Sequence, residues 1–325
     1  MYKKILSLCL ILCLSLSMLT GCGSKDSAST INLGCMKGPT AIGMIKLISD
    51  ADAGETAYSY AHTIAGTADE ISTGLINGTL DIAAVPCNLA SVLYNKTEGE
   101  IVTVAINTLG VLYIVESGDK IHSVNDLKGT TIYSTGQGTT PEYTLRYLLN
   151  SAGIDPDKDV TIEYKSEATE VVAALTQNPE AVAMLPQPYV TVATNNNPDL
   201  RIALNVAKEW EKLAGTGGTV VTGVLVARKS FLKDNPKVLK SFLEEYKASA
   251  EYANSNIEET AALLESYDVF KAAIAKKAIP YCSVTYIDGE YMKTLALSYL
   301  NVLYEQNPKA VGGKAPTEGM FYIEK

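Results

Sequence analysis

The sequence VAMLPQPYV, residues 182–190, repeats a design that the chain already uses one hundred residues earlier, where residues 82–90 read IAAVPCNLA. Each stretch is a short apolar run that stops at a proline, Pro86 or Pro186. The match continues backwards without a gap, so it predicts two structural units of the same design. The matched pairs before the prolines are Glu70 with Glu170, Ile71 with Val171 and Leu75 with Leu175.

Predicted strands and helices alternate from residue 31 onward, which is typical of a parallel sheet with helices on both faces. Residues 31–110 and 130–204 share one β-α-β-α-β-α order. Residues 39–51 are predicted as one helix, with Pro39 in its first turn. Beyond residue 231 the chain is mostly helical, interrupted by an extended piece at 279–287. The fold class is therefore α/β, with two similar units.

The prolines indicate where a ligand would bind. In open parallel sheets, ligands bind beyond the carboxyl ends of the strands. Pro86 and Pro186 are each predicted to be the first residue past a strand, where proline stops the ladder of hydrogen bonds. Two similar units would each offer such a sheet edge, and the two edges can face one another across a cleft.

The first helix of each unit follows a glycine-containing turn, with proline in its first turn. One turn is Lys37-Gly38-Pro39-Thr40, and the other spans residues 136–141, GQGTTP. Free backbone N–H groups and the positive end of a helix dipole attract an anion or a polar heterocycle, with about 0.3–1 kcal/mol from each exposed terminus. The alternative is plain capping by Thr40, Thr139 or Thr140, and the two roles are compatible.

The N-terminus has the layout of a secretory signal, because two lysines precede a short apolar run. Residues 19–22, Leu-Thr-Gly-Cys, resemble the bacterial lipobox, in which cleavage before the cysteine leaves it acylated. This resemblance implies a signal peptide at 1–21, a lipid anchor such as palmitate on Cys22, and a flexible tether at 22–30. An ordinary signal with an incidental cysteine is the alternative.

The charge and the cysteine content argue against several classes of protein. Without residues 1–21 the chain keeps 25 basic and 36 acidic residues, a net charge of −11, which disfavours binding to nucleic acid. Cys35, Cys87 and Cys282 remain besides Cys22, and this odd number argues against a full disulfide framework. Cys35 and Cys87 end two strands, where they are small apolar residues or, alternatively, a disulfide or soft-metal pair. We predict no metal, cofactor or catalytic residue.

Several motifs together resemble the solute-binding proteins of ABC importers. They are Gly-x-Thr-Pro-Glu-Tyr at 138–143, Ala-Gly-Ile-Asp-Pro at 152–156, Val-Val-Ala-Ala-Leu at 171–175, Asp81-Ile82-Ala83 after Gly78, and Trp210-Glu211-Lys212-Leu213. The likeness covers nearly the whole mature chain. It is greatest to the nitrate, sulfonate and taurine group, which includes binders of thiamine pyrimidines.

The resemblance implies a two-lobed periplasmic-binding-protein-like fold of type II, with two crossover strands and lobes that close over the ligand. Each lobe would be a mainly parallel sheet with helices on both faces. Lobe one would comprise 31–109 and 223–325, and lobe two 110–222. The family's binding positions fall on the segments already chosen and near residues 221–223. The predicted ligand-binding residues are Lys37, Gly38, Pro39, Thr40, Cys87, Asn88, Gln137, Gly138, Thr139, Thr140, Gln187, Tyr189 and Thr222.

The predicted turns favour a singly charged or neutral solute. Lys37 is their only cation, and a multiply charged anion would usually be matched by arginine. Asn88 and Gln187 can donate and accept, which suits a sulfonate, nitrate or pyrimidine edge. Tyr189 would supply a flat wall, with Tyr58 or Tyr60 as further candidates. Of the two histidines, His62 is a more plausible ligand contact than His122.

The predicted function is a monomeric, extracytoplasmic solute-binding lipoprotein that delivers its solute to an ABC permease and its ATPase. It would be held on the outer face of the cell membrane by its lipid. Two alternatives remain. One is an enzyme on the same fold, of the pyrimidine-forming type, although the cysteine-rich motif of those enzymes is missing here. The other is a sensing lobe that reports ligand to a membrane partner.

Overall fold

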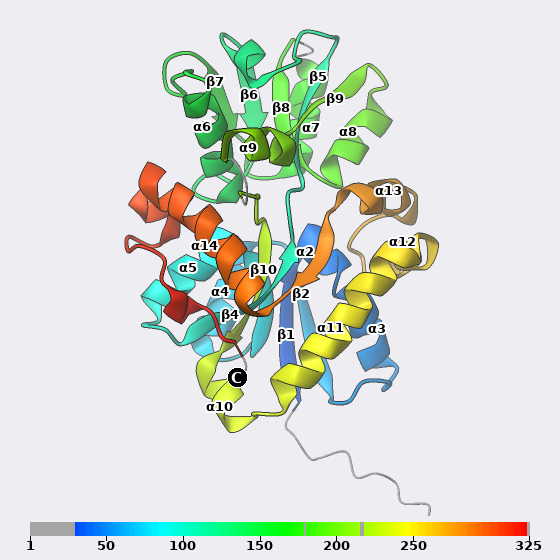
Figure 1. Cartoon of the computed structure of the whole chain (residues 1–325). Helices are drawn as coiled ribbons and strands as arrows, with labels where there is room; N and C mark the ends of the chain where they lie inside the picture. Colours follow the sequence, from blue (N-terminus) through cyan, green and yellow to red (C-terminus); the bar gives the residue numbers. More distant parts are fainter. Residues whose placement is uncertain (1–29, 179, 215–217, 324–325) are drawn as a thin grey trace, which may run out of the picture.

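The computed structural model describes residues 30–178, 180–214 and 218–323, and we call the parts built around its two sheets lobe one and lobe two. The predicted signal peptide, Cys22 and the tether up to residue 29 lie outside the described residues. No helix within the described ranges combines the length and the apolar character needed to cross a membrane. Figure 1 shows the sheets one above the other, with helices around each.

The sheet of lobe one has the order β11-β4-β10-β3-β1-β2. The central strands β1, β2 and β3 are parallel, whereas β10 is antiparallel to both β3 and β4. β11 is antiparallel to β4. The strands are β1 Ile31–Met36, β2 Tyr60–Ala65, β3 Ile82–Pro86, β4 Ile101–Thr108, β10 Gly223–Arg228 and β11 Val284–Ile287.

The sheet of lobe two has the order β7-β6-β8-β5-β9. β6 is parallel to β7 and β8, and β5 runs antiparallel between β8 and β9. The strands are β5 Leu112–Ser117, β6 Thr131–Ser134, β7 Thr161–Tyr164, β8 Val182–Pro186 and β9 Leu200–Asn205. The chain crosses to lobe two between β4 and β5 and returns before β10, so neither β5 nor β10 is shared by both sheets.

The helices lie on both faces of each sheet. In lobe one they are α2 Pro39–Ile42, α3 Ile45–Asp52, α4 Ala68–Asn77, α5 Cys87–Lys96, α10 Lys229–Asp234, α11 Val238–Ser255, α12 Ile257–Ser266, α13 Ala272–Ala278 and α14 Gly289–Gln306. In lobe two they are α6 Thr140–Ser151, α7 Ala168–Gln177, α8 Tyr189–Asn196 and α9 Val206–Ala214. Short 3₁₀ turns occupy Val124–Leu127, Ile279–Tyr281, Pro308–Val311 and Glu318–Met320.

The hundred-residue repeat predicted from sequence is present in the structure. Helices α4 and α7 begin and end one hundred residues apart, and so do strands β3 and β8. The prolines close these strands as their last residues rather than following them. The pairing repeats as well, since Gly223 of β10 lies opposite Pro86 and Leu112 of β5 lies opposite Pro186.

Local capping explains where the repeated helices begin. The Thr67 hydroxyl accepts the Glu70 N–H at 3.4 Å and donates to the Glu70 carboxylate at 3.1 Å, so only the N-cap half of the predicted capping box forms. In the second unit Glu167 replaces threonine, and both reciprocal bonds of a capping box form between Glu167 and Glu170. The predicted helix at 39–51 is divided into α2 and α3.

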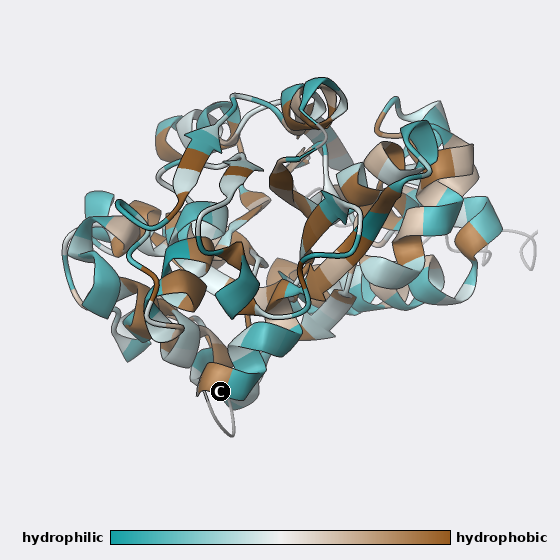
Figure 2. Cartoon of the chain, turned by 90° about the horizontal axis from the view of Figure 1, so that it is seen from above, coloured by the Kyte–Doolittle hydropathy of each residue, from teal (hydrophilic) through white to brown (hydrophobic). Residues whose placement is uncertain are grey.

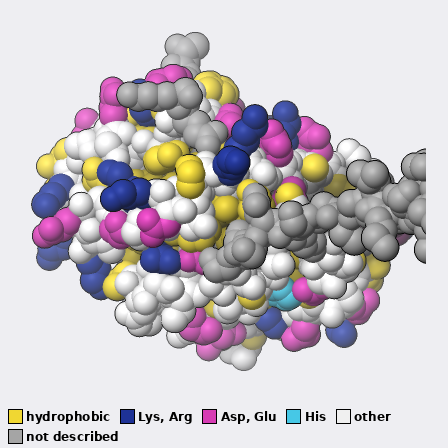
Figure 3. Space-filling model, turned by 90° about the horizontal axis from the view of Figure 1, so that it is seen from below, with side chains coloured by type: hydrophobic (Ala, Val, Ile, Leu, Met, Phe, Trp, Pro, Cys, Tyr) yellow, Lys and Arg dark blue, Asp and Glu magenta, His cyan; other side chains and the backbone are white. Residues whose placement is uncertain are grey.

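The apolar core continues from one lobe into the other. Figure 2 shows hydrophobic segments concentrated on the strands, with mixed colouring on the helices. The largest buried cluster includes Leu75 and Val85 of lobe one and Ile132 and Leu148 of lobe two. Trp210 of α9 joins them, because its ring lies 4.2 Å from that of Tyr147 and 5.2 Å from that of Tyr299 on α14. On the face drawn in Figure 3, the visible acidic and basic side chains are interspersed.

We expect Gly223→Ala to destabilise the protein, because a Cβ at this position would lie 2.5 Å from Asn107 Oδ1 and 2.9 Å from Thr40 Cγ2. Overpacking of this kind costs about 1–3 kcal/mol, which urea unfolding would measure. Gly66→Ala is the matched control, since a Cβ there meets nothing within 4 Å. Equal stabilities of the two variants would contradict the close packing of β10 against α2.

Candidate functional site

The structure brings the predicted sheet edges together at one buried contact between the lobes. The hydroxyl of Thr140, at the start of α6, donates to Asn88 Oδ1 of α5 at 3.1 Å. Asn88 Nδ2 donates to the carbonyl of Ala310 at 3.1 Å. Asn88 and Thr140 are 2% and 1% exposed, so solvent does not compete for these bonds. Both polar atoms of the Asn88 side chain are therefore used within the protein.

The turn before α2 holds four predicted residues, but it differs from the expected anion site. Gly38 has a φ of 155° and a ψ of −162°, a backbone conformation that only glycine adopts readily. The helix that follows has four residues, because Gly43 and Met44 interrupt it before α3. A helix of one turn carries only a small part of the macrodipole, so its pull on an anion is weaker than a long helix would give.

Close packing explains why position 43, between α2 and α3, is a glycine. A Cβ at Gly43 would lie 2.4 Å from the Tyr246 hydroxyl of α11. The glycine lets α11 approach the turn closely. The prediction of one long helix at 39–51 was wrong, since the structure divides it into α2 and α3. The Thr40 hydroxyl donates to the carbonyl of Met36 at 3.4 Å and does not cap α2.

The start of α6 is partly neutralised by its own helix. Gly138 N–H donates to Glu142 Oε2 at 2.7 Å, and Thr139 N–H donates to the carbonyl of Gly136 at 2.9 Å. A carboxylate thus already occupies a position where an anion would bind a helix N-terminus. Gln137 and Gly138 are exposed. The threonines do not cap the helix, because the Thr139 hydroxyl bonds Gly136 and that of Thr140 bonds Asn88.

Gln187 and Tyr189 stand at the edge of the second sheet. Gln187 is 1% exposed, and its Oε1 accepts the hydroxyl of Thr191 at 2.9 Å and the Thr191 N–H at 3.3 Å. No described residue accepts a hydrogen bond from its amide nitrogen, which remains an available donor. Tyr189 is half-buried, and burial raises the pKa of its hydroxyl, with a smaller contribution from the nearby Glu167.

Cys87 and Thr222 join the first sheet edge to the segment that returns from lobe two. Cys87 N–H donates to the Thr222 carbonyl at 3.0 Å, and Thr222 N–H donates to the Thr108 carbonyl at 3.1 Å. The side chains of Thr108 and Thr222 each bury a hydroxyl that meets no hydrogen-bond partner among the described residues. Buried hydroxyls without partners are uncommon and point to an absent water or ligand.

Asn107 is a residue that the sequence prediction missed. Its side-chain amide is also buried without a hydrogen-bond partner in the described part of the chain, beside Thr108. The Asn107 amide lies near the Tyr246 hydroxyl and lowers the pKa of that hydroxyl, whereas burial raises the same pKa by more. The two groups do not reach hydrogen-bond geometry. The sequence does contain a signal for this residue, because the apolar strand IVTVAINT ends in an asparagine and a threonine.

The three described cysteines are buried free thiols. Burial raises the pKa of Cys35 and Cys282 to about 12 and also raises that of Cys87. A neutral buried thiol behaves as a small apolar group, which agrees with the plainer of the two interpretations of Cys35 and Cys87. Within the described ranges, no cluster of three His, Cys, Asp or Glu residues has the geometry to hold a metal.

The other aromatic candidates lie away from the sheet edge. Tyr60 is the first residue of β2, at the end of the strand opposite to the predicted cleft, and its hydroxyl donates to Glu245 at 2.6 Å. The prediction of a ligand wall at Tyr60 was therefore wrong. His62 packs against the ring of Tyr267 at 5.6 Å, with its Nδ1 3.6 Å from an oxygen of Asp52.

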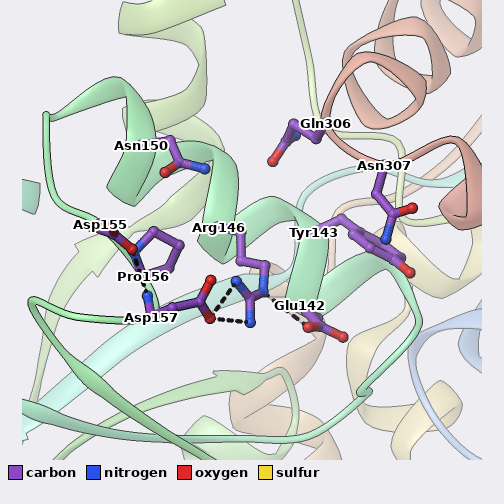
Figure 4. A pocket seen from close by; sticks show the side chains of 9 residues that line it. All are labelled: Glu142, Tyr143, Arg146, Asn150, Asp155, Pro156, Asp157, Gln306 and Asn307. Atoms are coloured by element: carbon purple, nitrogen blue, oxygen red, sulfur yellow. Dashed lines mark hydrogen bonds and ion pairs between the residues drawn. The ribbon is translucent and has the colours of Figure 1, made fainter.

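A cavity of about 400 Å³ lies between α6 and the end of α14, and Figure 4 shows the nine side chains that line it. Arg146 crosses it and pairs with Glu142 at 2.9 Å and Asp157 at 3.0 Å. None of the predicted ligand-binding residues lines this cavity. Its only cation is already matched by two carboxylates, so the cavity does not provide a free anion site.

We expect Thr140→Val to lower the free energy of unfolding by about 0.5–1.5 kcal/mol, through the loss of one hydrogen bond. Asn88→Ala should cost more, because it also leaves the Ala310 carbonyl unpaired. If the contact joins the lobes as described, the double variant will show a coupling energy of about 0.5–1.5 kcal/mol by urea unfolding. Thr176→Val on α7 is the control and should add to Asn88→Ala without coupling.

Comparison with known proteins gives matches over most of the chain. A family model described as "ABC transporter, phosphonate, periplasmic substrate-binding protein" matches residues 53–277. No curated protein matches. Among solved structures, an ABC transporter protein from Parabacteroides distasonis has a TM-score of 0.77 at 23% identity, covering 92% of this chain and all of the other.

Two further structures have named ligands. The aliphatic sulphonate binding protein SsuA from Escherichia coli has a TM-score of 0.71 at 18% identity, with 92% of this chain and 94% of the other covered. The nitrate-binding protein NrtA from Synechocystis has a TM-score of 0.65 at 14% identity, with 86% and 82% covered. At these identities the likeness shows a shared two-lobed fold.

Proposed function

Because the chain belongs to the family of periplasmic substrate-binding proteins of ABC transporters, phosphonate type, we propose that it captures a small, singly charged or neutral organic solute between its lobes. It would deliver this solute to an ABC permease and the attached ATPase. Sulfonate-like and nitrate-like solutes are suggested by the names of the structural neighbours. A pyrimidine-like solute is suggested by the uncharged amides at the sheet edges.

The buried contact between Asn88 and Thr140 is the observation that carries this proposal. It places the start of α5 in lobe one against the start of α6 in lobe two. Both helices begin at the carboxyl ends of parallel strands, where ligands bind in sheets of this kind. A solute held there would touch both lobes, and closure around it needs only a hinge motion.

We assign lobe one to residues 31–109 and 223–325, and lobe two to 110–222. The two crossing segments are hydrogen bonded through Thr222 and Thr108, which makes them a natural hinge. The residues that we propose to line the cleft are Lys37, Gly38, Pro39, Thr40, Cys87, Asn88, Gln137, Gly138, Thr139, Thr140, Gln187, Tyr189 and Thr222. Within this set Asn88 and Thr140 would act mainly by joining the lobes, since their polar atoms are already paired.

We further propose that the mature protein is a monomeric lipoprotein, anchored by acylated Cys22 to the extracytoplasmic face of the cell membrane. The lipobox-like sequence at residues 19–22 supports this proposal. The family model and the named neighbours describe binding proteins, which supports a role without catalysis. No observation favours the enzyme or the sensor alternative.

We expect the cognate solute to stabilise the folded protein by about 2.7 kcal/mol at one hundred times its dissociation constant. Thermal unfolding with sulfonates, nitrate, phosphonates and pyrimidines would identify it. Gln187→Ala should remove most of this stabilisation, because it deletes the available amide donor. The control is Gln177→Ala. Gln177 is an exposed glutamine at the end of α7 and does not belong to the predicted ligand-binding set. A full response of the Gln187 variant would contradict the proposed cleft.

We expect Cys22→Ser to release the protein from the membrane fraction, since the acylated residue would be lost. Fractionation of the native bacterium, with labelling by radioactive palmitate, would measure the change. Cys35→Ser is the control, because Cys35 is a buried thiol of β1. Membrane retention and undiminished labelling of the Cys22 variant would refute the anchor.

A further inference from the structure

The loop between α12 and α13 touches both sheet edges and forms a side wall of the proposed cleft. Asp268 Oδ2 in this loop lies 3.0 Å from Lys37 Nζ, at the edge of the first sheet. Phe270 packs edge-to-face on Tyr189, at the edge of the second sheet, with ring centroids 5.9 Å apart. Helix α13, which follows, lies beside α8 (Figure 1), and Lys277 Nζ donates to Asn195 Oδ1 at 2.9 Å.

The basic groups around this wall are paired with carboxylates, and Lys271 of the same loop lies 3.5 Å from Glu265. Lys37 is the only basic residue in the predicted ligand-binding set, and it is paired with Asp268, whose pKa it lowers. The Glu167 carboxylate lies near Tyr189 on the other side. The arginines offer no alternative cation, because each is paired with carboxylates elsewhere. These pairs are Arg146 with Glu142 and Asp157, Arg201 with Glu116 and Asp119, and Arg228 with Asp81.

The aromatic rings at this wall, and the polar groups there that have no hydrogen-bond partner within the described part of the chain, suit a solute with a flat ring. Tyr189 and Phe270 are both half-buried, so part of each ring is accessible beside the sheet edge. Aromatic side chains stack on flat solutes, or meet them edge-to-face. The Gln187 amide nitrogen is an available donor, and the Thr222 hydroxyl is buried without a partner among the described residues. Donors and acceptors of this kind recognise an amide-like edge.

We propose that the solute is an uncharged flat ring with an amide-like edge, and that Phe270 and Asp268 determine this specificity. The proposal rests on the proposed binding function and narrows its substrate class. Phe270 of lobe one and Tyr189 of lobe two pack edge-to-face on each other and together form one aromatic wall against which the ring would lie. Asp268, whose side chain is 97% exposed, pairs with Lys37 and offsets part of its charge, and the overall negative charge of the chain acts in the same direction.

The test is direct binding of two panels to the purified mature protein. Thymine, cytosine, hypoxanthine and nicotinamide represent uncharged rings, and nitrate, methanesulfonate and methylphosphonate represent oxyanions. Isothermal titration and the emission of Trp210, the only tryptophan in the chain, would report binding and lobe closure. We expect at least one ring compound to bind and the oxyanions to bind at least tenfold more weakly.

Two variants then test the specificity residues. Phe270→Ala should weaken ring binding about 3- to 10-fold, the size of an aromatic contact. Its control is Tyr291→Ala, which removes an aromatic side chain that is 63% exposed. Asp268→Asn should raise oxyanion affinity several-fold by freeing Lys37, and so lower the ratio of ring affinity to oxyanion affinity, whereas the exposed control Asp199→Asn should leave this ratio as it is.

The outcomes separate this inference from the function on which it rests. If an oxyanion binds and no ring compound does, the ring inference is wrong and the binding function stands. Ring binding that is indifferent to Phe270→Ala would also overturn it, by placing the solute away from this wall. If neither panel binds, the inference fails and the proposed function loses its support as well.

Discussion

The packing of α14 against lobe two is the constraint on which the facing sheet edges depend. Tyr299 of α14 lies against Trp210 of α9, and its hydroxyl lies 2.9 Å from the hydroxyl of Thr144 on α6. α14 itself packs on α5 and β4 of lobe one. Aromatic contacts of this kind contribute about 0.5–1.5 kcal/mol beyond the area that they bury. One helix thereby fixes α6 near α5 and allows Thr140 to reach Asn88.

The repeat gives the two lobes a similar backbone arrangement, but the side chains at the two sheet edges differ. Thr40 is the second residue of α2 and Thr140 the first residue of α6, yet Thr40 bonds within its own turn while Thr140 reaches the other lobe. The first turn carries Lys37, whereas the second turn, residues 136–141, carries no charged residue, so the two edges differ in charge as well. A duplicated backbone therefore gives two sheet edges with different side chains, and a cleft with two unlike edges can orient a solute as well as enclose it.

Local patterns were sufficient to predict the elements that line the cleft. The apolar runs before Pro86 and Pro186 became β3 and β8, and the Thr67 and Glu70 pattern became a real helix cap. These predictions succeed because strand ends and caps depend on neighbours within a few residues. The contact between Asn88 and Thr140 follows only indirectly, since the sequence indicates two equivalent turns but not their distance.

The features that escaped prediction depend on contacts between distant segments. The break between α2 and α3 lies at Gly43, which packs closely against Tyr246, two hundred residues away, and glycine at position 43 carries no sign of that partner. Asp268 and Phe270 reach the cleft because α11 and α12 pack against α3 of lobe one, which carries their loop to the sheet edge. The sequence of a turn between two helices contains no local pattern that would predict a contact with a ligand. In the proposed cleft, the packing of C-terminal helices would thus set the composition of the wall, whereas the strands would set its position.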